Sequence, residues 1–262
     1  MSETLTPGAA TPEPVPAGAA LAPQASARAP GLPPLYSKLE GVTAARHAAL
    51  RVRDAGFGFA AKATAVPLAA EEFVLAARSL PIVFAPQAPH LPVAITGLAA
   101  GSNLFVEANG AWRAGAYLPA YLRRYPFFML RVAAGSEELA LCIDPDASHV
   151  SDTQGEPLFT AEGKPAPQLD RSFALAKAVE EAVMKTRIMT ARLAELGLLK
   201  GAVIQFMHNG KPMRVDGFFT VDREALRALP PERLAELRDL GWLEAIYAHL
   251  MSIGGIQDLA RG

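Results

Sequence analysis

The sequence contains a single cysteine among its 262 residues. A disulfide framework needs at least two cysteines, and thiolate zinc or iron–sulfur sites need several, so this chain alone builds neither. The one thiol, Cys142, fits a reducing compartment. It stands between Leu141 and Ile143, in the middle of an expected strand where thiols are usually inert core atoms.

Long apolar runs and an excess of one charge are also missing. Residues 80–86 are a typical apolar burst, far short of the roughly 18 residues that suggest a membrane-spanning helix. The formal net charge is -1, and the sequence pI near 6.5 gives no field that attracts nucleic acid or anionic lipid. We therefore expect no transmembrane segment and no nucleic-acid partner.

Signatures of catalysis and of cofactor binding are scarce. Residues 56–61 match G-x-G-x-x-A, but no strand precedes them and no helix follows, as a dinucleotide site requires. Residues 144–155 imitate a calcium loop, yet His149 and Gly155 stand where its glycine and glutamate belong. The five histidines are widely separated, and there is no G-x-S-x-G elbow. We therefore predict no catalytic residue, no cofactor and no metal ligand.

Residues 1–34 are rich in proline and alanine, with eight of the 22 prolines and nine alanines but only three charged residues. Such a segment has too few large apolar side chains to offset its ordering entropy, so we expect a disordered leader. It serves either as a dispensable tail or as a docking segment. It lacks the basic start and long apolar stretch of a secretory signal, so we expect a cytoplasmic protein. One folded domain is expected over residues 35–262.

Short apolar runs predict antiparallel strands through the first half of this domain. Extended segments are expected at residues 57–59, 64–68, 82–84 and 93–96, with a short helix over 69–79. Hairpins are expected around Asn109-Gly110, between residues 127 and 143, and around Asn209-Gly210, with a bulge at Gly217. A polar loop is expected between the second hairpin and residue 167.

One long helix is predicted over residues 168–196, closed by Gly197 as a left-handed cap. Its apolar face comprises Leu175, Val179, Ala182, Thr186, Met189, Leu193 and Leu196. Phe173, Met184 and Ile188 form a second apolar side, which predicts packing against another helix or against a partner chain. Shorter helices follow Asp222 and Pro231. The last helix should bury Leu240, Leu243, Ile246, Tyr247 and Leu250, before a loose tail at Gly254-Gly255. The pattern predicts an α+β fold with the helices on one side of a sheet.

The segment from residue 112 to residue 128 stands out because it holds six of the 19 aromatic residues. Its candidate binding residues are Trp112, Tyr117, Tyr121, Arg123, Arg124 and Tyr125. Tyrosines spaced by four would lie along one side of a short helix, and arginine offers a planar fork for a carboxylate or phosphate. The composition suits a ligand or peptide surface, or an aromatic sub-core closed by an arginine salt bridge. Nucleic acid is disfavoured because the surroundings are not basic.

Several short motifs occur in a fixed order between residues 46 and 159. They include Arg46-His47, Val66-Pro67-Leu68, Pro81-Ile82-Val83-Phe84 and Asn103-Leu104-Phe105-Val106. The most specific is Tyr117-Leu118-Pro119-Ala120, followed by Leu122-Arg123-Arg124-Tyr125-Pro126-Phe127. Because it carries these motifs in this order, the segment 35–251 resembles the SapC family of bacterial proteins. Leu80 departs from the pattern, which has an aromatic residue before the proline.

The resemblance implies an association with surface layers or envelope uptake and no established catalytic residues. The permease label often given to the family conflicts with the lack of hydrophobic spans. We therefore expect a non-enzymatic binding or accessory protein of a bacterial envelope, surface-layer or uptake system. It would have a protein or peptide partner, and it could form an oligomer. The alternative is an enzyme, or the partner subunit of one, with a site around residues 112–128 and His47.

Overall fold

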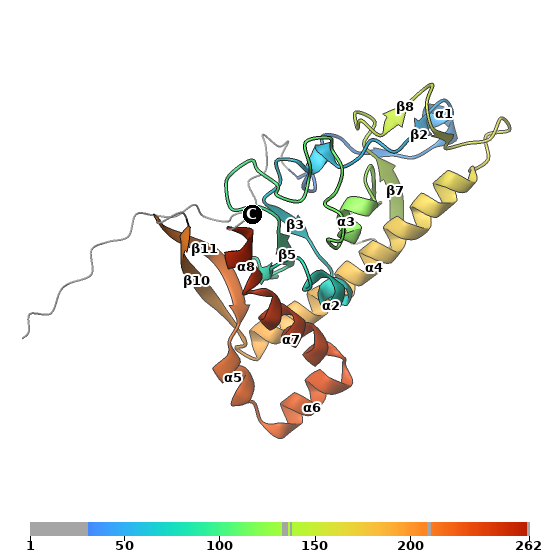
Figure 1. Cartoon of the computed structure of the whole chain (residues 1–262). Coiled ribbons are helices and arrows are strands. Elements are labelled where there is room, and N and C mark those ends of the chain that lie inside the picture. Colours follow the sequence, from blue (N-terminus) through green and yellow to red (C-terminus); the bar gives the residue numbers. More distant parts are fainter. Residues whose placement is uncertain (1–30, 133–135, 137, 209–210, 261–262) are drawn as a thin grey trace, which may run out of the picture.

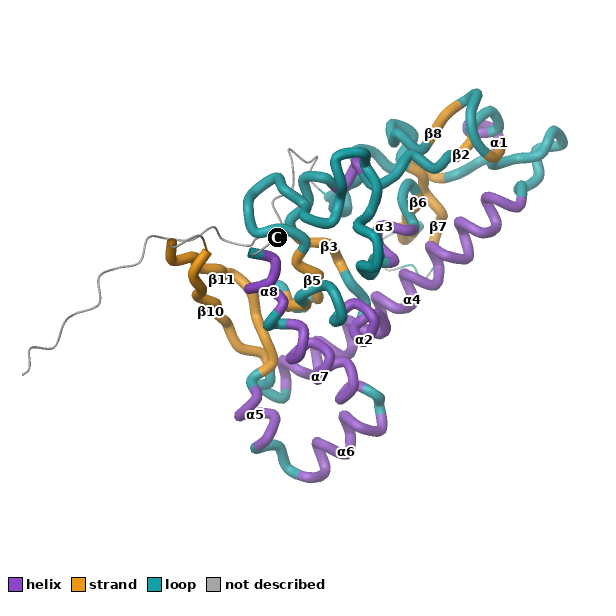
Figure 2. Tube along the Cα trace, viewed as in Figure 1, coloured by secondary structure: helices purple, strands orange, loops and turns teal. Residues whose placement is uncertain are grey.

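A computed structural model describes residues 31–132, 136, 138–208 and 211–260 (Figure 1). Most of the expected leader, residues 1–30, lies outside the described residues. The remainder forms helices and antiparallel strands in three sheets, which confirms the α+β class. The first described segment, residues 31–39, is called the strap below. The part of the molecule away from α5 and α6 consists largely of loops that join short strands (Figure 2).

The largest sheet has five antiparallel strands in the order β10-β11-β4-β5-β3. They are β3 (Ala65–Pro67), β4 (Ile82–Phe84), β5 (Pro92–Ile95), β10 (Leu199–His208) and β11 (Lys211–Val221). The strands expected at 64–68, 82–84 and 93–96 are thereby confirmed. All of β4 is buried, because the strand lies between two neighbours and under the main hydrophobic core.

The hairpin of β10 and β11 is longer than predicted, and its tip, Asn209-Gly210, lies outside the described residues. Its register shifts between Ala202 and Ile204. Gly217, which lies opposite this shift, has a φ of 80°, and the predicted bulge is confirmed. The hairpin joins the rest of the sheet where Phe219 pairs with Phe84.

Short helices pack around this sheet. They are η2 (Ala70–Glu72), α2 (Phe73–Ala76), α5 (Arg223–Arg227), α6 (Pro231–Asp239), α7 (Trp242–Ser252) and α8 (Gly255–Leu259). Asp222 caps α5 as predicted, because its side chain accepts the amide hydrogens of Glu224 and Ala225. The α7 helix contacts α2, α6, β4 and β11.

His249 fixes α7 to the sheet and is fully buried. Its Nδ1 donates to the carbonyl oxygen of Ile82 at 2.9 Å. Its Nε2 therefore accepts, from the amide of Val221 at 3.1 Å and from the hydroxyl of Thr220 at 2.9 Å. Burial lowers the pKa of His249 to about 4, so the ring is neutral at physiological pH.

A second sheet has the order β1-β7-β6 and is joined to the first by the long helix α4. Its strands are β1 (Glu40–Gly41), β6 (Phe127–Arg131) and β7 (Leu139–Ile143), and α4 spans Pro167–Glu195. Strands β6 and β7 form the second predicted hairpin. The helix packs on β6 and reaches η2, running along one side of the molecule (Figure 1).

A third, small sheet has the order β8-β2-β9, with β2 (Arg51–Val52), β8 (Val150–Ser151) and β9 (Glu156–Pro157); α1 spans Ala44–His47. The polar loop expected before residue 167 is thus wrong, because that segment pairs twice with β2. Gly155 allows the chain to turn back toward β2 before β9, since a Cβ at this position would overlap the carbonyl oxygen of Val52. Three sheets also replace the single sheet that was expected, since β6 and β7 pair with β1 and not with β3–β5.

The long helix and its cap are as predicted. Val179, Ala182, Thr186, Met189 and Leu193 are buried, and Leu175 and Leu196 are half-buried. Gly197 has a φ of 67°, and the amide of Leu198 donates to the carbonyl of Leu193 at 2.9 Å, as in a Schellman cap. The second apolar side is not covered by another helix, however: Phe173, Met184 and Ile188 are exposed among the described residues.

Tertiary packing overrides two local predictions in the first half. Residues 57–59 are not extended, because Gly58–Ala60 form the 3-10 helix η1, which places the ring of Phe59 against that of Tyr125. Around Asn109-Gly110 only one isolated bridge forms, between Val106 and Trp112.

The C-terminal helices depart from the predicted stripe in a similar way. Leu240, which precedes α7, and Tyr247, which lies in it, are about half exposed, at 52% and 51%, so neither contributes to a buried face. The loose tail predicted at Gly254-Gly255 is wrong as well. Helix α8 begins there, and its Ile256 is fully buried.

Candidate functional site

The segment 112–128 does not form one continuous helix. Its only helix, α3, spans Ala120–Arg123 and contacts β3. Pro126 disfavours helical geometry for the residue before it, which ends the helix. Tyr117 therefore precedes α3 and Tyr125 follows it. The predicted stack of three tyrosines along one helix side is wrong for this reason.

Two of the predicted site residues are engaged in packing and hydrogen bonds. The ring of Trp112 stacks on Phe105 with centroids 5.6 Å apart, and its Nε1 donates to the carbonyl of Tyr117 at 3.1 Å. The hydroxyl of Tyr117 donates to Oε1 of Glu72 at 2.9 Å. Burial and the negative charge of Glu72 raise the pKa of Tyr117 to about 12.

Glu72 organises this region, a role that the sequence did not reveal. Its carboxylate is buried and also accepts the amide hydrogens of Ala69 at 2.9 Å and Ala120 at 2.7 Å. The bond to Ala69 is the half of a capping box that the glutamate supplies. The only signal of this role in the sequence is the position of Glu72, three residues after Ala69. Glu72 thereby ties the start of α3 to η2.

Tyr121 and Tyr125 belong to an aromatic cluster beneath the strap. The cluster comprises Tyr36, Phe59, Tyr121, Tyr125 and Phe128. Tyr125 stacks on Phe59 at 3.9 Å with an interplanar angle of 9°. The hydroxyl of Tyr121 donates to the carbonyl of Pro34 at 2.6 Å. The segment thus builds an aromatic sub-core, which was one of the two favoured interpretations.

Arg124 differs from these residues because its charge is buried without full compensation. Its side chain is only 2% exposed. The guanidinium carbon lies 3.9 Å from the ring centroid of Phe128 and 4.6 Å from that of Tyr121. Its Nη1 lies 3.9 Å from Oε2 of Glu180, which is too far for a hydrogen bond. Among the described residues, no acceptor is within hydrogen-bond reach of Nε or Nη1 of Arg124.

Arg124 lines a cavity of about 340 Å³, which we call the Arg124 cavity. It lies between the strap, the edge of the five-stranded sheet, the hairpin β6–β7 and α4. Its apolar walls include Pro33, Pro34, Leu68, Leu91, Phe128, Leu139 and Val183. Ligand sites in proteins are usually apolar pockets of about this size with a few polar groups on the wall. The Arg124 cavity has this composition.

The charges around the Arg124 cavity are unequal. Arg124, Arg131 and Arg187 line it, whereas Glu180 is the one acidic residue in its described lining. Arg123 is exposed and lies on a neighbouring hollow of about 230 Å³, which Arg124 and Tyr125 also line. Of the six predicted site residues, the structure therefore brings only Tyr121 and Arg124 to the cavity.

The ordered motifs that contribute Tyr117 and Arg124 to this region fall within a match to a known family. The SapC family model matches residues 42–259. The chain belongs to the SapC family. No curated protein and no solved structure matches it. Within the part of the chain that the structure describes, no helix is long and apolar enough to cross a membrane.

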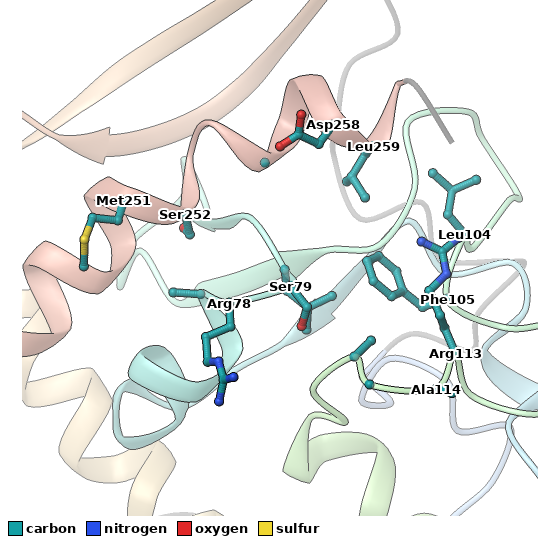
Figure 3. A pocket seen from close by; sticks show the side chains of 15 residues that line it. Arg78, Ser79, Leu104, Phe105, Arg113, Ala114, Met251, Ser252, Asp258 and Leu259 are labelled. Carbon is teal, nitrogen blue, oxygen red and sulfur yellow. The ribbon is translucent and has the colours of Figure 1, made fainter.

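The SapC region contains a larger hollow of about 490 Å³ between α2, residues 104–116 and helices α7 and α8 (Figure 3). The guanidinium groups of Arg78 and Arg113 point to different sides of it. Ser79 accepts the amide hydrogen of Tyr117, and Ser252 accepts that of Ile82. Its polar side chains therefore do not converge on one point, and we regard the Arg124 cavity as the candidate site.

Other reactive side chains of the SapC region are engaged in the fold. His47 accepts the amide hydrogen of Thr43 and lies 3.5 Å from Glu40, so its polar partners are outside segment 112–128. Burial raises the pKa of the Cys142 thiol. Within the described ranges, no three His, Cys, Asp or Glu side chains are grouped as a metal site would require.

Asp144, which begins the calcium-like sequence, has a structural role. It is fully buried and accepts the amide hydrogens of Ser37 at 2.7 Å and Lys38 at 3.4 Å, together with the Ser37 hydroxyl hydrogen. It also accepts the amide hydrogen of Asp146 at 3.1 Å. Asp144 therefore pins the strap to the end of β7.

Proposed function

We propose that this chain is a non-catalytic binding or accessory protein of a bacterial envelope or uptake system, and that it binds through the Arg124 cavity. The observation that carries the proposal is the guanidinium of Arg124, which is buried while two of its nitrogens lack an acceptor among the described residues. Leaving a buried donor unsatisfied costs about 1–3 kcal/mol. Arg124 lines the cavity, and a ligand whose acceptors reach its guanidinium would recover this energy on binding.

The surroundings of Arg124 support binding over chemistry. The charged side chains of the cavity lining are three arginines and Glu180. The hydroxyl of Thr186, on the same wall, donates to the carbonyl of Ala182 and accepts the amide hydrogen of Ala70. Such a lining can hold and orient a molecule, but its two hydroxyls, of Thr186 and Tyr121, are already engaged in the fold.

The cellular context of the proposal comes from the SapC family and its association with the envelope. We place the chain in the cytoplasm, where it serves a protein or peptide partner of an envelope, surface-layer or uptake system. The exposed apolar side of α4, formed by Phe173, Met184 and Ile188, offers an area for that partner or for a second copy of the chain.

The test is a comparison of what co-purifies with three forms of the tagged full-length protein in its native cells. The forms are the wild type, Arg124→Lys, and Arg78→Lys as a matched control at an exposed arginine outside the cavity. Lysine cannot reproduce the donor pattern of a guanidinium. We expect a specific molecule or protein to be retained by the wild type and the control, and to fall at least tenfold with Arg124→Lys. Equal recovery from all three forms would refute the proposal.

A further inference from the structure

We infer that the Arg124 cavity takes a small amphipathic monocarboxylate, with its carboxylate at Arg124 and its apolar body along the cavity wall. The inference rests on the proposed function, because it names the ligand class of the same cavity. Three observations point to this class: the sign of the charge, the apolar lining, and the position of Glu180.

The charge of the cavity favours an anion. Three arginines line it against one glutamate. Arg131 donates to the carbonyl of Ser136. Because this carbonyl is neutral, the positive charge of Arg131 is not neutralised. The most deeply buried of the three is Arg124, whose side chain is 2% exposed. In a site of low effective dielectric, hydrogen bonds between a guanidinium and a carboxylate are among the strongest available to a protein.

The walls require the rest of the ligand to be apolar. Phe128 and Tyr121 lie against the guanidinium, and Leu68, Leu91 and Val183 line the cavity further on. A volume of about 340 Å³ corresponds to about eleven waters of liquid volume. It therefore accommodates a ligand of roughly that many non-hydrogen atoms, the size of a medium-chain fatty acid.

The position of Glu180 separates a monoanion from a dianion. Its Oε2 lies 3.9 Å from Nη1 of Arg124, beside the place that the ligand's head would occupy. A phosphate with two negative charges meets stronger repulsion there than a carboxylate with one. An amide head would instead donate a hydrogen bond to Glu180, so the two kinds of head respond in opposite ways to the loss of this charge.

The experiment is calorimetric titration of the purified full-length protein with four probes. Octanoate carries both parts of the expected ligand, octanamide replaces the charge by a neutral head, octylammonium reverses it, and acetate lacks the apolar body. We expect octanoate to bind at least tenfold more tightly than each of the others. Equal binding of octanamide, or no binding of octanoate, would overturn the ligand class.

Two variants test the geometry. Arg124→Lys should weaken octanoate binding at least tenfold, whereas Arg78→Lys should not change it. Glu180→Gln should strengthen binding about threefold, because it removes the neighbouring negative charge; weaker binding would indicate a head that donates to Glu180 and would overturn the carboxylate. Thermal unfolding of each variant confirms that the fold is retained. If octanoate fails while Arg124→Lys still loses its cellular partner, the ligand class is wrong and the proposed function stands.

Discussion

Replacing Arg124 by methionine tests whether this buried charge serves the fold or a ligand. A methionine side chain approximates the length of the arginine stem and fills irregular apolar space. If Arg124 were half of a structural ion pair, its removal would strand Glu180 and destabilise the protein by about 3–5 kcal/mol. The structure predicts a much smaller effect.

The magnitude follows from what Arg124 gains and loses in the fold. The variant removes two buried nitrogens without acceptors, each of which costs about 1–3 kcal/mol. It also removes two contacts with aromatic rings, worth about 1 kcal/mol each, and a favourable electrostatic interaction with the hydroxyl of Tyr36. Glu180 keeps access to water, since its side chain is 20% exposed. These effects nearly cancel, so we expect stability within about 1 kcal/mol of the wild type.

The assay is a pair of urea denaturation curves, for the wild type and Arg124→Met, analysed for midpoint and slope. Binding of the co-purifying molecule is measured on the same samples. We expect the midpoint to move little and binding to be lost. Destabilisation by 3 kcal/mol or more would contradict the reasoning and assign Arg124 to the fold.

Three further outcomes follow from the hydrogen bonds described above. The contribution of His249 to stability should be complete above about pH 7 and be lost, by up to about 3 kcal/mol, as the pH drops to 4, because the unfolded chain protonates His249 near 6.5 and the native state only near 4; the difference between the wild type and His249→Asn in denaturation at several pH values should show this dependence. Glu72→Ala should destabilise the protein by about 3–5 kcal/mol in urea denaturation, since it strands two buried amide donors and the half-buried Tyr117 hydroxyl, whereas Tyr117→Phe should cost only about 1 kcal/mol; equal losses would contradict this expectation. Starting the chain at Leu35 instead of residue 31 should lower the thermal midpoint by roughly 2–4 °C, because Tyr121 loses its acceptor at Pro34; an unchanged midpoint would show that the strap's first residues contribute nothing.

The sequence predicts the elements whose signals are local. The apolar face of α4 repeats over eight turns, and Gly197 ends the helix with a conformation that glycine adopts easily. The hairpins β6–β7 and β10–β11 have apolar arms around a polar turn. In these cases local preference and tertiary packing favour the same structure.

The elements that the sequence misjudges are those that distant partners reshape. Phe57 and Phe59 alternate like strand residues, but their rings meet Trp112 and Tyr125 from a helical turn. The segment before residue 167 has the composition of a loop, yet it pairs with β2, which lies about a hundred residues earlier. Periodicity within one segment contains no information about such pairs.

The sequence predicted only part of the candidate site, because its walls come from segments that are far apart in the chain. The composition of segment 112–128 drew attention to Arg123 and Arg124 together. It could not show that Arg123 is exposed whereas Arg124, which follows α3, is buried. Glu180, on the α4 wall of the cavity, lies more than fifty residues after Arg124. Leu91 and Pro33 are also distant from Arg124 in the sequence, so no local pattern connects them with it.

The contact between Asp144 and the strap has a consequence for how the protein is made. The strap leaves the ribosome early, but the carboxylate that holds Ser37 is 107 residues further along the chain. The α4 wall of the cavity comes later still, about 150 residues after Pro34, a delay on the order of ten seconds at typical rates of synthesis. Tyr36 and its neighbours therefore remain without their docking surface until about the middle of the chain has been synthesised. The first described part of the chain to be synthesised is thus buried only after about a hundred further residues have been made, and the cavity is complete only once α4 has been made.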